Sequence, residues 1–280
     1  MQHLKVGVLG GGSWGTTVAA LITRNVPVTL WARNPDTVRE INETHRNETY
    51  LPGAVIPDKL VATNDIGECV SGADVVVMGI PSQNFRAVLE EVREHIRPWV
   101  PVISLTKGLE LDTRMRMTEI ITEVLPGHPV GVLTGPNLAR EIMAGQAAAS
   151  VIAMEDEIIV KALQNVFKSG LFRVYTNTDV IGCELGGVLK NIIAIAVGMG
   201  DGQGAGDNTR SALITRGLSE ITRLGVAMGG RAETFAGLAG MGDMIATCTS
   251  PQSRNRHVGI ELGKGRSMQE IVDEMVMVAE

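Results

Sequence analysis

The sequence predicts an α/β protein in which a doubly wound parallel sheet precedes a smaller all-helical domain. A strand-like segment, residues 4–9, leads directly into a glycine-rich turn and a helix-like segment. Strand-like and helix-like segments then alternate as far as about residue 177, which is typical of βαβ units. From about residue 178 only helix-like segments follow.

The first half predicts a Rossmann-like dinucleotide-binding domain over residues 1–177. The run 74–81 is almost continuously apolar, as expected for a parallel strand that is buried on both faces. Further strands are expected at 28–32, 102–105, 130–134 and 147–153, and helices at 14–24, 37–46, 85–96 and 114–124.

The second half predicts a helical substrate and catalytic domain over residues 178–280. Helices are expected at 180–197, 209–228 and 253–262, with a small-residue stretch at 237–248. Ligands of open α/β sheets bind beyond the carboxyl ends of the strands. We therefore expect the reactive cleft between the two domains.

Composition excludes several classes of function. With 25 Lys and Arg against 31 Asp and Glu, the net charge is −6, and only 3% of the residues are aromatic. Nucleic-acid binding normally needs a concentrated basic surface, so no nucleic-acid partner is expected. The five histidines are scattered without the spacing of metal ligands, so no metal site is expected.

Cysteine usage and hydropathy predict a cytoplasmic protein. The three cysteines form no C-x-x-C pair and read as reduced thiols. A strand begins by Leu4, which leaves no room for a signal peptide. The apolar stretch 186–199 contains Lys190 and Asn191 and is too short to span a bilayer, so no stable membrane insertion is expected.

The glycine-rich turn has the spacing G-x-G-x-x-G at Gly10, Gly12 and Gly15. Gly10 permits the tight turn, Gly12 lets the backbone approach a pyrophosphate, and Gly15 lets the helix pack closely on the strand. The phosphates would lie at the helix N-terminus, where unpaired N–H groups favour anions. The alternative is a structural turn, but the strand–turn–helix context favours a dinucleotide site.

The end of the second strand bears on the choice of cofactor. Folds that select NAD usually place an acid there, about 20 residues after the glycine turn. This sequence has Trp31-Ala-Arg33-Asn34 and no acid before Asp36. Arg33 can bind a 2′-phosphate, which predicts NADP(H) or the use of both cofactors. The alternative is a solvated arginine.

Two lysines are candidates for chemistry. Lys107 follows a predicted strand and can meet a phosphate or polarise a carbonyl, although a surface lysine is an equal alternative. Lys190 lies in an apolar, glycine-rich helix, where desolvation disfavours the ammonium form and suits the residue to acid–base catalysis. Lys190 alternatively extends to solvent or pairs with Glu184.

Two further segments suggest a ligand. Asp243 ends the small-residue run Gly237-Leu-Ala-Gly-Met-Gly-Asp243, where a backbone can approach closely, and its alternative role is a helix N-cap. Ser253-Arg-Asn255 opens a helix and combines hydroxyl, guanidinium and amide groups at a helix N-terminus, which suits a phosphorylated substrate. Simple capping by Ser253 is the alternative.

Together these segments resemble the bacterial NAD(P)-dependent glycerol-3-phosphate dehydrogenases, in order and over essentially the whole chain. The Lys-Asn-Ile-Ile segment combined with the glycine-rich run and Ser-Arg-Asn is far more specific than the glycine turn. The matching segments are Gly10-Gly-Gly-Ser-Trp-Gly15, Asn47-Glu-Thr-Tyr-Leu-Pro-Gly53, Lys107-Gly-Leu-Glu110, Gly135-Pro136 with Ala139 and Glu141, Leu189-Lys-Asn-Ile-Ile193, Gly237-Leu-Ala-Gly-Met-Gly-Asp243 and Ser253-Arg-Asn-Arg256.

The resemblance implies roles for individual residues. Lys190 would be the proton acceptor, and Arg254 would bridge substrate and cofactor. Besides the glycines Gly10, Gly12 and Gly15, the implied cofactor contacts are Ser13, Trp14, Arg33, Tyr50, Lys107, Ala139, Arg254, Val278 and Glu280. The implied substrate contacts are Lys107, Gly135, Asn137, Lys190, Asp243, Ser253, Arg254 and Asn255.

Two departures from the family pattern stand out. Asn137 takes the place of a Ser or Thr, so that substrate contact would differ in detail. Relatives also continue into further helices after the position of Glu280. The resemblance therefore does not define the contacts near this point, including those of a homodimer.

The resemblance implies reversible hydride transfer between NAD(P)H and dihydroxyacetone phosphate, giving sn-glycerol 3-phosphate for glycerophospholipid synthesis. One alternative is a related two-domain dehydrogenase that acts on another hydroxy acid. A second is a non-catalytic NADP(H)-binding sensor, against which the presence of Lys190 and Asp243 argues.

Overall fold

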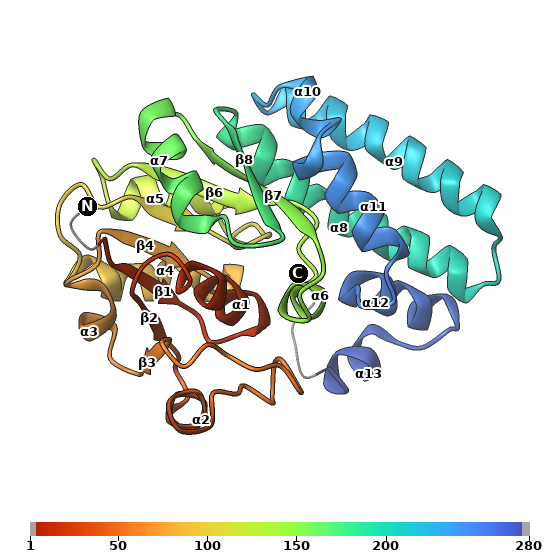
Figure 1. Cartoon of the computed structure of the whole chain (residues 1–280). Coiled ribbons are helices and arrows are strands. Elements are labelled where there is room, and N and C mark those ends of the chain that lie inside the picture. The colour runs from red at the N-terminus through yellow and green to blue at the C-terminus, as the bar shows by residue number, and fades with distance from the viewer. Residues whose placement is uncertain (1–3, 276–280) are drawn as a thin grey trace. The chain divides into compact units, whose positions relative to one another are not determined.

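The computed structural model describes residues 4–275, which divide into two compact units (Figure 1). Unit 1 consists of the residues up to Leu133 together with Asn137–Thr178. Unit 2 consists of Thr134–Pro136 together with the residues from Asp179 onward.

Unit 1 is built on a sheet with the strand order β3-β2-β1-β4-β5-β6-β7-β8. The strands are β1 (Val6–Leu9), β2 (Val28–Trp31), β3 (Val61–Thr63), β4 (Val75–Met78), β5 (Val102–Ser104), β6 (Val130–Thr134), β7 (Ala148–Met154) and β8 (Phe172–Asn177). From β3 to β6 every neighbouring pair is parallel, as is β7 with β8. The order reverses at β1, between β2 and β4, which confirms the predicted Rossmann-like, doubly wound sheet.

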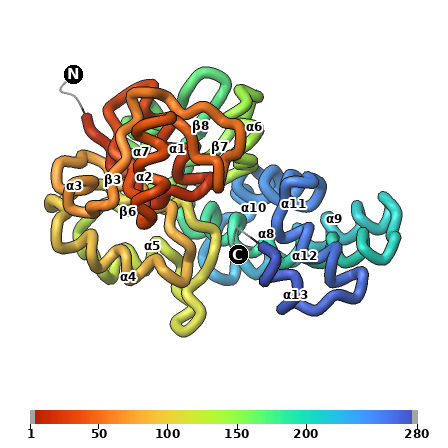
Figure 2. The backbone as a smooth tube through the Cα atoms, turned by 90° about the horizontal axis from the view of Figure 1, so that it is seen from below, coloured from red at the N-terminus to blue at the C-terminus, as the bar shows by residue number. Residues whose placement is uncertain are grey.

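Helices cover both faces of this sheet. They are α1 (Ser13–Ile22), α2 (Pro35–Thr44), α3 (Ile66–Val70), α4 (Ser82–Arg93), α5 (Met117–Val124), α6 (Ala139–Met143) and α7 (Glu157–Phe167). Side chains alternate across the sheet, so Val75 and Val77 of β4 join the core that contains α1 and α7. Val76 and Met78 join the core that contains α3, α4 and α5, and Figure 2 shows α4 and α5 side by side.

From Asp179 onward, the described residues of unit 2 form helices and the turns that join them. Unit 2 contains α8 (Val180–Gly202), α9 (Asp207–Ala227), α10 (Ala232–Phe235), the π-helical turn η1 (Leu238–Gly242), α11 (Asp243–Thr249), α12 (Arg254–Gly263) and α13 (Met268–Asp273). Helix α8 packs against α9, α11 and α12, and its Leu185 and Leu189 contribute to a core with Phe235 and Met244.

Helix α8 is longer than the apolar stretch seen in the sequence. Its 23 residues make it long and apolar enough to cross a membrane, but 67% of its apolar window is buried inside the protein. The core helix of a globular domain passes the same test of length and hydropathy, and α8 has that position here.

Glycines bring α8 and α12 into close contact. A Cβ atom at Gly198 would lie 2.2 Å from the carbonyl oxygen of Arg256, and one at Gly259 would lie 2.2 Å from that of Ile195. Because no larger side chain fits, the two backbones fix each other's position. This contact sets the distance between Lys190, on α8, and the N-terminus of α12.

Candidate active site

The glycine turn follows β1 and has the shape that a bound pyrophosphate needs. Gly10 has a φ of +118°, and a Cβ atom there would lie 2.2 Å from the carbonyl oxygen of Gly79. A Cβ atom at Gly15 would lie 2.0 Å from the carbonyl oxygen of Gly10. At Gly12, by contrast, no atom lies within 4 Å of such a Cβ. The turn is therefore tightly packed on the protein side and open at Gly12.

The first helical N–H groups are available to a ligand. Those of Ser13 and Trp14 donate no hydrogen bond to any group among residues 4–275. The indole of Trp14 packs edge-on against Phe172 of β8, at 6.4 Å between ring centroids. These features fit the pyrophosphate of a dinucleotide.

Arg33 lies just after β2 and is exposed. It makes no hydrogen bond or ion pair with any part of the chain that the structure describes. The nearby polar residues are engaged locally, since Asn34 caps α2 through the N–H of Asp36, and the Asp36 carboxylate pairs with Arg39. The guanidinium is therefore available to a 2′-phosphate, and its role stays a prediction.

The other predicted cofactor residues have varied positions. Tyr50 is half-buried, and its N–H donates to the carbonyl of Asn47 at 3.2 Å. Ala139 is half-buried at the start of α6, and Lys107 is half-buried in the loop after β5. Val278 and Glu280 lie outside the described residues.

The loop that carries Lys107 is held on α4 by an ion pair. Both oxygens of Glu110 accept hydrogen bonds from Arg86, at 2.8 and 2.9 Å. These bonds, together with one from the Thr113 hydroxyl, lower the pKa of Glu110 to about 2. Glu110 therefore holds the lysine's loop in place, a role that the motif did not reveal.

A buried polar cluster lies in unit 2, around Lys190. Its Nζ donates to Oγ1 of Thr247 at 2.5 Å and lies 3.2 Å from Oδ1 of Asp243. Only 5% of Lys190, 2% of Asp243 and 9% of Thr247 is exposed. Lys190 therefore does not extend to solvent, and a buried charge pair is formed instead.

Helix α11 places both partners of Lys190. The π-helical turn η1 ends at Gly242, whose N–H donates to the carbonyl of Gly237 at 3.1 Å, and α11 starts at Asp243. Asp243 and Thr247 are four residues apart and share one helical face. The hydroxyl of Thr247 also bonds the Asp243 carbonyl at 2.7 Å. Sequence reasoning missed Thr247, although the four-residue spacing from Asp243 was a usable signal.

The N-terminus of α12 carries the predicted phosphate residues. Ser253 caps the helix, because its hydroxyl accepts from the N–H of Arg256 at 3.2 Å, and its contact with the substrate stays a prediction. Arg254 is exposed, whereas Asn255 is 9% exposed. The helix runs for 10 residues, long enough for its N-terminus to favour an anion.

An ion-pair network ties this helix to α8 and α9. Asp201 accepts from Arg256 at 2.7 Å through Oδ2 and from Arg210 at 2.8 Å through Oδ1. Burial alone would raise the pKa of Asp201, but the hydrogen bonds from Arg210 and Arg256 lower it below its usual value. Asp201 therefore stays ionised and anchors α12.

Gly135 and Asn137 follow β6. Gly135 has a φ of +132°, which a residue with a side chain rarely adopts. The Oδ1 of Asn137 accepts a hydrogen bond from the buried hydroxyl of Ser150. Its Nδ2 is buried without a partner in the described chain. The side-chain amide of Asn137 therefore has an N–H group left to donate to a ligand, which the hydroxyl of a Ser or Thr could not offer in the same way.

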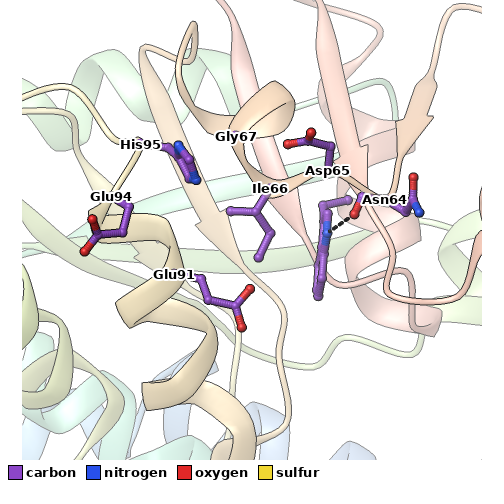
Figure 3. Close-up of a pocket in the computed structure, with 8 residues that line it drawn as sticks. Asn64, Asp65, Ile66, Gly67, Glu91, Glu94 and His95 are labelled. Carbon is purple, nitrogen blue, oxygen red and sulfur yellow. Dashed lines mark hydrogen bonds between the residues drawn. The ribbon is translucent and has the colours of Figure 1, made fainter.

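A separate pocket of about 510 Å³ lies in unit 1, between the start of α3 and the end of α4 (Figure 3). None of the predicted site residues lines it; its lining includes Asp65, Glu91, Glu94 and His95. Asp65 caps α3 through the N–H of Glu68 at 2.9 Å. Within residues 4–275, no group of His, Cys, Asp or Glu is arranged to hold a metal ion.

Comparison with known protein families shows which kind of dehydrogenase this chain resembles. Residues 5–160 match the family described as NAD-dependent glycerol-3-phosphate dehydrogenase N-terminus. Residues 179–280 match the corresponding C-terminus family. The chain belongs to the NAD-dependent glycerol-3-phosphate dehydrogenase family. The resemblance stated from the sequence is thereby confirmed.

Relatives within the glycerol-3-phosphate dehydrogenase family match over nearly the whole chain. The glycerol-3-phosphate dehydrogenase [NAD(P)+] 2 of Sphingopyxis alaskensis is 74% identical over 279 residues, which is 100% of this chain and 84% of that relative. The glycerol-3-phosphate dehydrogenase [NAD(P)+] of Mycobacterium avium is 56% identical, over 100% of this chain and 82% of its own.

Solved structures of the family share the fold. The glycerol-3-phosphate dehydrogenase of Coxiella burnetii matches with a TM-score of 0.94 and 38% identity, over 99% of this chain and 85% of its own. The enzyme of Saccharomyces cerevisiae matches with a TM-score of 0.86 and 30% identity, over 99% of this chain and 87% of its own.

Proposed function

We propose that this protein catalyses reversible hydride transfer between NAD(P)H and dihydroxyacetone phosphate, giving sn-glycerol 3-phosphate. Unit 1 holds the dinucleotide, and unit 2 carries most of the residues that hold the phosphorylated substrate. The observation that carries the proposal is the buried pair of Lys190 and Asp243, with Thr247 as a second partner of the lysine. Family membership supports the substrate and the cofactor class.

Lys190 moves the proton in this reaction. When bound, the nicotinamide supplies or accepts the hydride at C2 of the substrate. In reduction the ammonium of Lys190 polarises the ketone oxygen and donates a proton to it. In oxidation the neutral amine accepts the hydroxyl proton. Asp243 and Thr247 hold Nζ in place, at 3.2 and 2.5 Å.

The N-terminus of α12 holds the phosphate. The helix N–H groups, Arg254 and Asn255 are suited to bind its oxygens, and Lys107 and Asn137 bind the rest of the substrate. Energy from this remote contact fixes C2 in the geometry for hydride transfer. An unphosphorylated ketone forgoes that energy, so it should be a poor substrate.

The cofactor is NADP(H), NAD(H) or both. The open glycine turn suits the pyrophosphate that both forms share, and the exposed Arg33 favours the 2′-phosphate of NADP(H). The contacts implied for Tyr50, Ala139 and Arg254 belong to the same proposal.

We expect the reaction to take place in the cytoplasm and to supply sn-glycerol 3-phosphate for glycerophospholipid synthesis. Burial raises the pKa of Cys69 and of Cys183 to about 12, so both thiols stay protonated and unreactive. No nucleic acid takes part.

A homodimer is proposed on family resemblance alone, and light scattering after size-exclusion chromatography tests it.

The test is oxidation of NADPH and NADH at 340 nm with dihydroxyacetone phosphate and, separately, with unphosphorylated dihydroxyacetone. We expect turnover with the phosphorylated ketone only. Equal turnover of both ketones, or reduction of a keto acid but of neither ketone, points to a different dehydrogenase. Tight NADPH binding without turnover of any phosphorylated ketone points to a sensor.

Lys190→Ala sharpens this test. Turnover should fall by about 10²–10⁴-fold, because proton transfer is lost, while NADPH still binds. Lys161→Ala is the matched control, since Lys161 is exposed and its ion pair within the described structure is with Glu157 of the same helix, α7. Near-normal kcat in Lys190→Ala would remove the residue from proton transfer.

A further inference from the structure

Asn47 joins the loop after α2 to the glycine turn. It is wholly buried, at 0% exposure. Its Nδ2 donates to the carbonyl oxygen of Gly11 at 2.8 Å and to the hydroxyl of Thr16 at 3.0 Å. The contact reaches back 36 residues along the chain, so it joins two segments that are distant in sequence.

The carbonyl that Asn47 holds belongs to the peptide between Gly11 and Gly12. A trans peptide is planar, and its C=O and N–H point in opposite directions. No peptide bond in the described structure is cis. Drawing the Gly11 oxygen toward Asn47 therefore turns the N–H of Gly12 away from Asn47.

That N–H is one of the donors a pyrophosphate can use. It donates to no group among the described residues, and the space beside the Gly12 α-carbon is open to 4 Å. Three successive glycines, Gly10 to Gly12, leave this peptide with little local restraint on its rotation. A tether from outside the turn can supply the missing restraint.

We propose that Asn47 is a positioning residue for cofactor binding: it fixes the Gly11–Gly12 peptide so that the Gly12 N–H faces the dinucleotide pyrophosphate. The backbone carbonyl oxygen of Asn47 also accepts a hydrogen bond from the N–H of Leu51 at 2.7 Å. The turn that contains Tyr50 is thereby attached to the glycine turn. The proposal rests on the dinucleotide site of the proposed function and not on the identity of the substrate.

The experiment is fluorescence titration of the purified full chain with NADPH and with NADH. In Asn47→Ala the Kd for both cofactors should rise about tenfold, which corresponds to about 1.4 kcal/mol. The ratio of the two Kd values should stay unchanged, because the pyrophosphate is common to both. Thermal unfolding of the same samples reports the loss of stability separately.

Asn42→Ala is the matched control. Asn42 makes hydrogen bonds of the same kind, donating to the carbonyl of Ala62 at 2.9 Å and accepting its N–H at 2.8 Å. It joins α2 to β3 and, within residues 4–275, makes no hydrogen bond to the glycine turn. This variant should lower the melting temperature and leave both Kd values within about twofold of the parent.

Asn47→Leu is a second variant that keeps about the size of the side chain and adds no charge to the buried site. Leucine has no N–H to donate, so both Kd values should again rise. Unchanged Kd values in folded Asn47 variants, or an equal rise in Asn42→Ala, would overturn the proposal. Failure of the proposed function looks different, because NADPH then binds normally and dihydroxyacetone phosphate is not reduced.

Discussion

The Nζ of Lys190 lies 3.2 Å from Oδ1 of Asp243, with only 6% and 3% of the two side chains exposed. Lys190 comes from the middle of α8, and Asp243 is the first residue of α11. Two opposite charges at this depth depend on each other, because each compensates the lost hydration of its partner.

Removal of one charge should therefore cost more stability than removal of both. Asp243→Ala leaves a buried ammonium uncompensated and should lower the free energy of unfolding by about 3–5 kcal/mol. The double variant Lys190→Met with Asp243→Leu should recover most of that loss, although it will be inactive. Urea unfolding of the parent, both single variants and the double variant measures this. A double variant no more stable than Asp243→Ala would contradict the expectation.

The hydroxyl of Thr247 should contribute to turnover. Thr247→Val keeps the shape of the side chain but removes the oxygen that accepts from Lys190 at 2.5 Å. The lysine then holds its position less well, and kcat should fall by about tenfold, or about 1.4 kcal/mol. Thr247→Ser retains the hydroxyl and is the control. Equal kcat values for the valine and serine variants would show that the hydroxyl has no part in turnover.

Arg33 should govern the preference between cofactors. Arg33→Asp places an acid where folds that select NAD have one, so the Kd for NADPH should rise at least tenfold while that for NADH stays within a few-fold. Titration with both cofactors measures the ratio. Arg39→Ala is the control, because Arg39 pairs with Asp36 on α2. The assignment fails if NADPH affinity is the same in Arg33→Asp and the parent.

The stabilising effect of Glu110 should depend on pH. Its folded pKa of about 2 lies below the ordinary 4.5, so the ionised form stabilises the fold above pH 4.5. That contribution decreases as the pH falls from 4.5 toward 2. Glu110→Gln should therefore be less stable than the parent at pH 7, and the gap should narrow below pH 4.5. Urea unfolding from pH 3 to 7 tests this, with the more exposed Glu123→Gln as the control.

Asp201 allows a comparison of two arginines on one carboxylate. Arg256→Gln should raise the KM for dihydroxyacetone phosphate several-fold, because Arg256 lies on α12 beside the proposed phosphate residues. Arg210→Gln loses a bond to the same carboxylate but lies on α9, so it should lower stability and leave KM unchanged. The Kd for NADPH should stay constant in both. Identical KM values in the parent and in both variants would show that Asp201 has a structural role only.

Strong local patterns made much of the fold predictable. Residues 4–9 and 74–81 are apolar in nearly every position because β1 and β4 are buried on both faces. Strand β3 has three residues, too few for any periodicity to show. Strand β8 alternates buried Phe172 with exposed Arg173, the weaker pattern of a half-buried strand at the sheet edge. For these reasons no strand was predicted at β3 or β8. Helix α7 was not predicted either.

Contacts across long distances made the site less predictable. Lys190 was noticeable because a charge interrupts an apolar helix, and Asp243 because it ends a glycine-rich run. Thr247 offers only its four-residue spacing from Asp243, and its hydroxyl matters only once α11 packs on α8. Asn47 resembles any loop asparagine until the fold brings it to Gly11. The roles predicted for the remaining site residues stay predictions.

The glycine contact between α8 and α12 limits how this protein can be made more heat-resistant. Replacing helical glycines with alanine is a common route to stability, worth up to about 1 kcal/mol at each exposed site. At Gly202 and Gly263 the added methyl would lie 2.3 and 2.4 Å from a carbonyl oxygen of the facing helix, so the helices would have to separate. Engineering for heat tolerance should therefore use other kinds of substitution, at the exposed positions of α9, because its own Gly217 and Gly225 are also buried.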